Sequence, residues 1–221
     1  MTDKIDRIFA LNREWARQQT VGDPNYFRNL ARQQKPDYLW IGCSDSRVSA
    51  DRVAGLRPGE VFVHRNVANQ VIHTDLNCLS VMDFAIGTLQ VEHIMVVGHY
   101  GCGGIHAVLS NAAKGLVESW LGHVRDIRDQ YADWLHALPT DRLRSRLLCE
   151  LNIIEQVRNV AHTGLVTKAW HKRQKLYLHG WIYGLEDGLL IDLGVDISSP
   201  ETIDTACSLS LIHISEPTRP Y

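Results

Sequence analysis

Two short polar motifs, each directly after a short apolar run, constrain the fold of this chain most. The motif CSDSR (residues 43–47) follows the run YLWIG (residues 38–42), and GHYGCGG (residues 98–104) follows HIMVV (residues 93–97). Short apolar runs that end at glycine are typical of buried strands. Ligands of open α/β sheets bind beyond the carboxyl ends of the strands. The two motifs are therefore expected to meet at one edge of a sheet.

The rest of the chain alternates between strand and helix patterns. Further strands are predicted at residues 61–65 and 175–183, and residues 189–195 are predicted to return as a hairpin strand after a turn at 186–188. Helices are predicted twice within residues 1–35, and over residues 75–90 with Thr74 as N-cap, 103–113, 116–138, 140–161 and 165–174. This alternation predicts an α/β fold with a mostly parallel central sheet of about four strands, an antiparallel edge strand and flanking helices.

Composition excludes several classes of protein. The 221 residues fit one large domain, and a formal net charge of -2 argues against a nucleic-acid-binding protein. No apolar run reaches the roughly 18 residues of a membrane span, and the first 17 residues lack the pattern of a secretory signal. A cytoplasmic protein without membrane partners is predicted. Five cysteines, an odd number, do not indicate a disulfide framework.

The two motifs together supply donors that suit zinc. Cys43, Asp45, His99 and Cys102 offer two sulfurs, a carboxylate and an imidazole, and zinc takes these donors in four-coordinate sites. A single cysteine at a strand end is usually a small buried apolar residue, so either motif alone is weak evidence. Their coincidence at two strand ends favours one zinc ion per chain. Arg47 lies beside Asp45 and can receive its carboxylate, which indicates a catalytic site rather than a structural one.

These motifs resemble those of the β-class carbonic anhydrases. The match extends over CSDSR (43–47), HRNVAN (64–69) and GHYGCGG (98–104), and the likeness covers about residues 5–197 and is greatest to bacterial members. The resemblance implies reversible hydration of carbon dioxide to bicarbonate and a proton. It places the family's zinc ligands on Cys43, Asp45, His99 and Cys102, and its catalytic dyad on Asp45 and Arg47.

A mechanism follows from this resemblance. Hydroxide on the zinc ion is expected to attack carbon dioxide, and Asp45 is expected to gate the site by moving between zinc and Arg47. Two thiolates cancel the charge of the metal, so activity should increase toward alkaline pH. Some members also bind bicarbonate away from zinc, and the matching allosteric residues here are Trp40, Arg65 and Tyr183. The alternative is that Trp40 and Tyr183 are strand core and Arg65 is a structural ion-pair partner.

The chain is interpreted as three segments. Residues 1–35 form an N-terminal helical arm, residues 36–205 a zinc-binding α/β catalytic domain, and residues 209–221 a tail. The tail resembles the conceptual translation of a sequencing adapter and is predicted to be non-native; the alternative is a genuine apolar strand followed by a proline-limited end. Related enzymes self-associate, so a dimer or tetramer is expected, and the apolar stripe from Ile5 to Trp15 is suited to embracing a neighbour or to packing on its own domain.

Two other functions remain open at this stage. A hydrolase of carbon disulfide or carbonyl sulfide would use the same scaffold. A non-catalytic bicarbonate sensor would hold a permanently closed, structural zinc ion with Asp45 as the fourth ligand. Arg47 counts against the sensor, because it has little purpose unless Asp45 leaves the metal.

Overall fold

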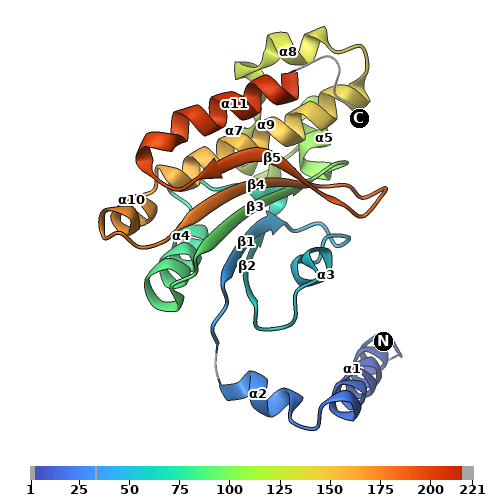
Figure 1. The fold of residues 1–221 in the computed structure, drawn as a ribbon. Coiled ribbons are helices and arrows are strands. Elements are labelled where there is room, and N and C mark those ends of the chain that lie inside the picture. Colours follow the sequence, from blue (N-terminus) through green and yellow to red (C-terminus); the bar gives the residue numbers. More distant parts are fainter. Residues whose placement is uncertain (1–2, 33, 216–221) are drawn as a thin grey trace. The chain divides into compact units, whose positions relative to one another are not determined.

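A computed structural model describes residues 3–32 and 34–215, and it divides the chain into two compact units, residues 1–35 and residues from 36 onward. The first unit contains the two expected helices, α1 (Asp3–Gly22) and α2 (Tyr26–Arg32) (Figure 1). The ring of Trp15 on α1 meets the ring of Phe27 on α2 edge to face, with ring centroids 5.6 Å apart.

The second unit is built on a five-stranded sheet in the order β2-β1-β3-β4-β5 (Figure 1). The strands are β1 (Tyr38–Cys43), β2 (Val61–Asn66), β3 (His93–His99), β4 (Tyr177–Tyr183) and β5 (Leu190–Ile197). The first four strands pair in parallel and β5 pairs antiparallel to β4 at the edge. The predicted fold class is therefore confirmed. Most residues of β1 and β3 are buried, as continuous apolar runs in a parallel sheet require.

Helices cover the sheet, and α9 and α11 lie side by side over one face in Figure 1. The helical segments of this unit are α3 (Ala50–Ala54), η1 (Val67–Asn69), α4 (Leu76–Asp83), η2 (Phe84–Leu89), α5 (Gly103–Leu109), α6 (Leu116–Trp120), α7 (Gly122–Gln130), α8 (Ala132–Ala137), α9 (Asp141–Ala161), α10 (Gly164–His171), η3 (Pro200–Thr202) and α11 (Ile203–Ser215). The main apolar core lies between these helices and the sheet. A smaller cluster around Trp40 and Met95 lies apart from it.

Two helix predictions were wrong in detail. Residues 116–138 form three short helices rather than one, because the backbone leaves helical geometry at Leu121 (φ −79, ψ 3) and Tyr131 (φ −107, ψ 25). These bends allow each of the three short helices to pack against the core. The helix predicted over residues 75–90 splits into α4 and the π-helical segment η2. Its N-cap is Asp75 rather than Thr74, because the Asp75 carboxylate accepts a hydrogen bond from Asn77 N.

The tail is helical as far as it is described, so the alternative of an apolar strand was wrong. Residues 209–215 continue α11, and residues 216–221 lie outside the described part of the chain. Ser210 and Ile214 are buried, and Ser210 Oγ donates a hydrogen bond to Leu193 O of β5 at 2.7 Å. A helix lets one face of this segment pack on β5 and α9, which an extended strand would not. The adapter origin of the tail stays a prediction.

All five cysteines are buried and free of disulfide bonds, as their number indicated. Within residues 3–32 and 34–215, none of the helices has the length and apolar character that crossing a lipid bilayer requires.

Candidate metal centre

Strand register brings the two motifs together. Cys43 ends β1 and His99 ends β3, and these strands are parallel neighbours that pair Gly42 with Val97. Both carboxyl ends therefore meet at one edge of the sheet. After His99 the chain turns at Gly101, whose φ of 68 lies in the left-handed region that glycine adopts without strain. The turn returns the backbone so that Cys102 becomes the N-cap of α5.

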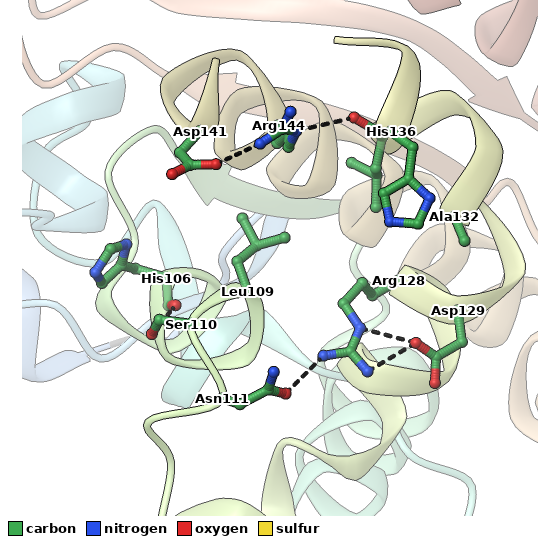
Figure 2. Close-up of a pocket in the computed structure, with 11 residues that line it drawn as sticks. His106, Leu109, Ser110, Asn111, Arg128, Asp129, Ala132, His136, Asp141 and Arg144 are labelled. Atoms are coloured by element: carbon green, nitrogen blue, oxygen red, sulfur yellow. Dashed lines mark hydrogen bonds and ion pairs between the residues drawn. The ribbon is translucent and has the colours of Figure 1, made fainter. Parts of the chain in front are cut away.

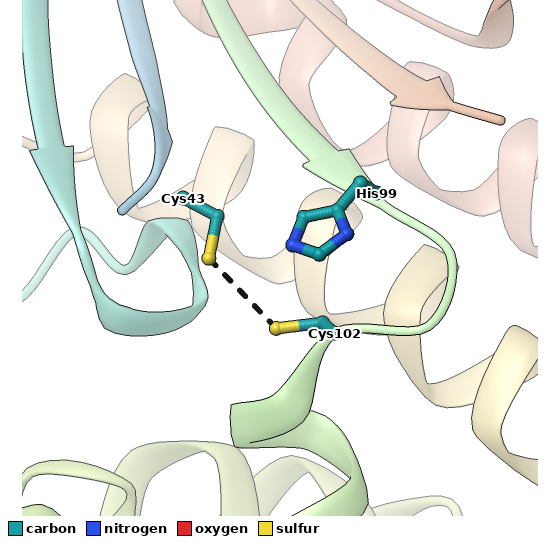
Figure 3. A group of neighbouring side chains, drawn as sticks. All are labelled: Cys43, His99 and Cys102. Carbon is teal, nitrogen blue, oxygen red and sulfur yellow. Dashed lines mark hydrogen bonds between the residues drawn. The ribbon is translucent and has the colours of Figure 1, made fainter. Parts of the chain in front are cut away.

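Cys43, His99 and Cys102 converge in the interior (Figure 3). One donor atom from each lies within 4.8 Å of the other two, and the two sulfurs are 3.9 Å apart. Two sulfurs bound to one tetrahedral zinc ion at bonds of about 2.3 Å would lie about 3.8 Å apart. The observed separation matches this requirement closely, so the three side chains are already arranged for a zinc ion.

The imidazole of His99 is oriented to bind a metal. Its Nδ1 lies 3.0 Å from Tyr100 O, and because a carbonyl only accepts, Nδ1 carries the proton. The lone pair is therefore on Nε2, which is buried and has no hydrogen-bond partner among the described residues. A buried acceptor without a partner is costly. A metal ion between Nε2 and the two sulfurs would remove that cost, so the donor set fits zinc.

The two thiols share a proton. The hydrogen bond between the sulfurs lowers the pKa of Cys43 and raises the pKa of Cys102, because the proton stays on the more deeply buried sulfur. The backbone N–H groups of Ala68 and Asp45 also lower the pKa of Cys43. A divalent cation would replace the shared proton and hold both side chains as thiolates.

Asp45 is paired with Arg47 and not grouped with the other three predicted ligands. Arg47 Nε donates to Oδ1 at 2.9 Å, Nη2 donates to Oδ2 at 2.6 Å, and the Arg47 backbone N–H donates to Oδ1 at 2.9 Å. These bonds hold the pKa of Asp45 well below its usual range. Asp45 Oδ2 still lies only 3.7 Å from His99 Nε2. The carboxylate is thus next to the donor set but bonded to arginine.

The three residues predicted to bind bicarbonate lie on β1, β2 and β4. Arg65 donates from Nε to Cys43 O at 2.8 Å and from Nη2 to Asp45 O at 2.5 Å, so it holds the backbone of the motif after β1. Trp40 is buried in the smaller apolar cluster, and Tyr183 packs against that cluster. The strand register places Arg65 on the same face of the sheet as Trp40.

Sequence reasoning missed an anchor on α9. Tyr100, between the ligand His99 and Gly101, donates its hydroxyl to the carboxylate of Glu150, which is fully buried. The guanidinium of Arg146 stacks over the Tyr100 ring, 3.7 Å from the centroid. These contacts fix the loop that carries two of the ligands. The sequence signal that could have indicated these contacts was the presence of charged residues among the apolar positions of a buried helix.

A second group of possible donors consists of His64, Asp75 and Cys78. The side chain of Asn66 is oriented by Gln70, because its Oδ1 accepts from Gln70 N and its Nδ2 donates to Gln70 O. Asn66 Nδ2 therefore also donates to His64 Nε2, and the His64 proton is on Nδ1. Neither imidazole nitrogen has a free lone pair. Burial raises the pKa of Cys78 to about 12, so its sulfur is held as a thiol and this group is interpreted as structural.

Two cavities lie beside the part of the fold that carries the metal donors. One, of about 530 Å³, is lined by Arg47 and Gly101 and so reaches the Asp45–Arg47 pair. The other, of about 550 Å³, lies among α5, α7, α8 and α9 and contains none of the metal donors (Figure 2). Its arginines, Arg128 and Arg144, are paired with Asp129 and Asp141 and also donate to backbone carbonyls. Their charges are therefore used within the fold.

Comparison with known proteins identifies the family. The family described as "Carbonic anhydrase" matches residues 38–190. A carbonic anhydrase of Emericella nidulans is 45% identical over 86% of this chain and 84% of its own length. The structure of a Coccomyxa β-carbonic anhydrase in complex with acetazolamide superposes with a TM-score of 0.85 at 37% identity, covering 93% of this chain and 96% of that one. The chain belongs to the β-class carbonic anhydrases.

A third similarity is to a tetrameric β-carbonic anhydrase from the filamentous ascomycete Sordaria macrospora. It has a TM-score of 0.85 at 32% identity and covers 89% of this chain and all of that chain. The expected likeness to bacterial members is not confirmed by these matches, since two of the three proteins are fungal. The bicarbonate pocket likewise stays a prediction.

Proposed function

We propose that this protein is a zinc enzyme that reversibly hydrates carbon dioxide to bicarbonate and a proton. The observation that carries the proposal is the convergence of Cys43, Cys102 and the unpartnered Nε2 of His99 within one buried group. Family membership supports the same activity. Cys43, His99 and Cys102 would hold the ion, and a bound zinc ion supplies the Lewis acidity that lets water ionise near neutral pH.

Asp45 and Arg47 have defined tasks in this proposal. Arg47 keeps Asp45 ionised and bonded to itself rather than to the metal, which leaves a fourth position for solvent. The Asp45 carboxylate accepts hydrogen bonds only, so it orients a water molecule or a protonated product oxygen beside it. The cavity next to Arg47 and Gly101 gives a small neutral substrate access to this pair.

We further propose that Asp45 gates the site. The 3.7 Å separation between Asp45 Oδ2 and His99 Nε2 supports this, because a rotation of one short side chain would carry the carboxylate into the fourth ligand position. Breaking the bidentate pair with Arg47 would be the main cost of that movement. In the closed arrangement no solvent position remains, and the enzyme would be inactive.

We also propose that bicarbonate controls the gate through Arg65. Both hydrogen bonds of Arg65 end on carbonyls of the segment that carries Cys43 and Asp45. An anion on this guanidinium, beside Trp40 and Tyr183, would compete with those carbonyls. The segment would then be released, and with it the Asp45–Arg47 pair.

The activity is tested by metal analysis and stopped-flow hydration of carbon dioxide between pH 7 and pH 9. Wild-type protein is expected to hold one zinc ion per chain and to be active, whereas Cys102→Ser loses both zinc and activity. Arg47→Ala is expected to keep zinc and lose most of its activity. Cys78→Ala, which removes a buried thiol outside the centre, is the matched control and should retain both.

Three outcomes would contradict the proposal. Undiminished hydration by Cys102→Ser would remove the metal from the mechanism. Zinc-loaded wild-type protein with only background activity across this pH range would indicate a bicarbonate sensor. Faster turnover of carbon disulfide or carbonyl sulfide than of carbon dioxide would identify a related hydrolase.

A further inference from the structure

The segment from Asn66 to Val71, between β2 and α4, has an unusual backbone. Ala68 (φ 66, ψ 30) and Asn69 (φ 45) are consecutive residues in the left-handed region, although neither is glycine. Both are buried. Left-handed geometry is strained for a residue such as Ala68, whereas asparagine adopts it more readily. The surrounding structure must therefore impose this conformation.

This strained segment lies directly against the metal donors. Asn66 pairs with Cys43 in the β1–β2 ladder, and Ser44 N donates to Asn66 O at 2.9 Å. Two residues further on, Ala68 is fully buried in the same core cluster as Cys43 and Cys102. The segment also touches the other motif, because a Cβ atom added to Gly104 would lie 3.3 Å from the Ala68 Cβ.

Three amide side chains of α9, which we call the amide ladder, hold the segment from behind. Asn152 Nδ2 donates to Ala68 O at 2.9 Å, and Gln156 Oε1 accepts from Val71 N at 2.7 Å. Asn159 Nδ2 donates to Val71 O at 3.0 Å. The ladder is also bonded internally, since Gln156 Nε2 donates to Asn152 Oδ1 at 3.0 Å.

Packing alone does not explain why these buried positions of α9 carry amide side chains. Asn152 and Gln156 are each 1% exposed, on a helix whose other buried positions are mainly apolar. A buried amide is costly unless it is hydrogen-bonded, and an apolar side chain of similar size would pack there without that cost. Each hydrogen bond from the amide ladder to the segment instead satisfies a backbone group of Ala68 or Val71 that takes no part in the regular hydrogen bonding of a helix or sheet. The polar residues are thus matched to the strained segment.

We propose that Asn152, supported by Gln156, is a positioning residue of the metal centre. By fixing the Ala68 carbonyl it keeps Ala68 left-handed, and this conformation holds the segment against Cys43 and against Gly104 of the second motif. The segment thereby supports the two sulfurs at the separation that a metal requires. This inference rests on the proposed function, since it assigns an outer support to the same centre.

The test compares Asn152→Leu with Val157→Ala on the same helix. Val157 is buried and faces Gly180 of the sheet rather than the strained segment, so its variant reports on loss of packing alone. Two measurements are made: hydrogen exchange of the Ala68 amide by NMR in metal-free protein, and titration with cobalt(II) followed by the thiolate-to-cobalt charge-transfer band.

In Asn152→Leu the Ala68 amide is expected to lose protection, the charge-transfer band to shift, and cobalt affinity to fall about 10- to 100-fold. Val157→Ala should lower the melting temperature but leave the band and the affinity unchanged. Adding Ala68→Gly to Asn152→Leu should restore part of the affinity, because glycine adopts this conformation without strain. Asn152→Ala serves if the leucine variant does not fold.

Unchanged cobalt affinity and an unshifted band in folded Asn152→Leu or Asn152→Ala would overturn the inference and leave the proposed function intact. An equal loss in Val157→Ala would do the same, because it would show a general effect of stability. Wild-type protein that binds neither cobalt nor zinc would instead overturn the proposed function itself.

Discussion

Asp45 accepts three hydrogen bonds from Arg47, and this pairing determines its charge. The bonds favour the carboxylate over the acid and outweigh the opposing effect of burial, so the pKa of Asp45 is held well below its ordinary value. Asp45 is therefore ionised from mildly acidic to alkaline pH. A rise in hydration rate above pH 7 would therefore not report the deprotonation of Asp45.

The same lowered pKa predicts how the pair contributes to stability. A carboxyl group with a lowered pKa in the folded state stabilises the fold above its unfolded pKa of about 4, and this contribution is lost as the pH falls below that value. Arg47→Ala should therefore lower the free energy of unfolding at pH 7 and at pH 5, with a smaller difference from wild type at pH 3. Because the Arg47 side chain is 57% exposed, the effect should be modest and reduced by salt.

Urea denaturation of metal-free protein at these three pH values provides the measurement. Arg142→Ala is a suitable control, because Arg142 pairs with Glu186 at the surface, with both side chains at least 70% exposed. A difference between wild type and Arg47→Ala that grows as the pH falls would contradict the assignment of a low pKa to Asp45.

At the scale of helices and strands, the sequence predicted those features that depend on the local pattern of residues. The central strands β1 and β3 could be predicted because each is a short apolar run, and three candidate metal donors could be located because they lie at or directly after the ends of these strands. The breaks at Leu121 and Tyr131 could not, since no proline or glycine pattern distinguishes the bend at Tyr131. At these two breaks, packing of the helices against the core outweighed the helical periodicity of the sequence.

Contacts between distant elements were beyond prediction for a different reason. Asn152 of α9 bonds Ala68, which lies 84 positions earlier, and nothing local in either segment indicates the partner. The orientation of Asp45 was equally hidden. Sequence placed it between two possible partners, the metal and Arg47, and only the geometry of the motif after β1 shows it bonded to Arg47.

The contact between β2 and the motif after β1 leads to a prediction about bicarbonate. Crystals soaked in bicarbonate should show an anion on Arg65, loss of its bonds to Cys43 O and Asp45 O, and a broken Asp45–Arg47 pair. The reason is competition, since the guanidinium cannot direct the same N–H groups at both the anion and the two carbonyls. Tyr183→Phe, which keeps the ring and removes the hydroxyl, should weaken anion binding. An anion on Arg65 with the motif unmoved would refute control of the gate.

At the scale of the whole molecule, α1 carries more apolar surface than the unit of residues 1–35 buries by itself. Its stripe consists of Ile5, Ile8, Phe9, Leu11 and Trp15, whose exposed fractions range from 42% to 59%. Residues 1–35 contain only two helices, and a pair of this size cannot bury such a stripe within itself. Covering it with a second copy of the chain would bury these side chains.

We therefore expect the protein to be a dimer or tetramer in which this stripe is buried, and expect Phe9→Glu to weaken the assembly. A glutamate in an apolar interface must either be desolvated or hold the surfaces apart. A cost of about 3 kcal/mol would raise the dissociation constant by roughly 100-fold. Ala10→Glu, on the opposite face of the same helix, adds the same charge and should leave the assembly unchanged. Sedimentation equilibrium of the three proteins separates these outcomes. A monomeric wild type, or equal masses for wild type and Phe9→Glu across a wide concentration range, would show that the stripe has another use.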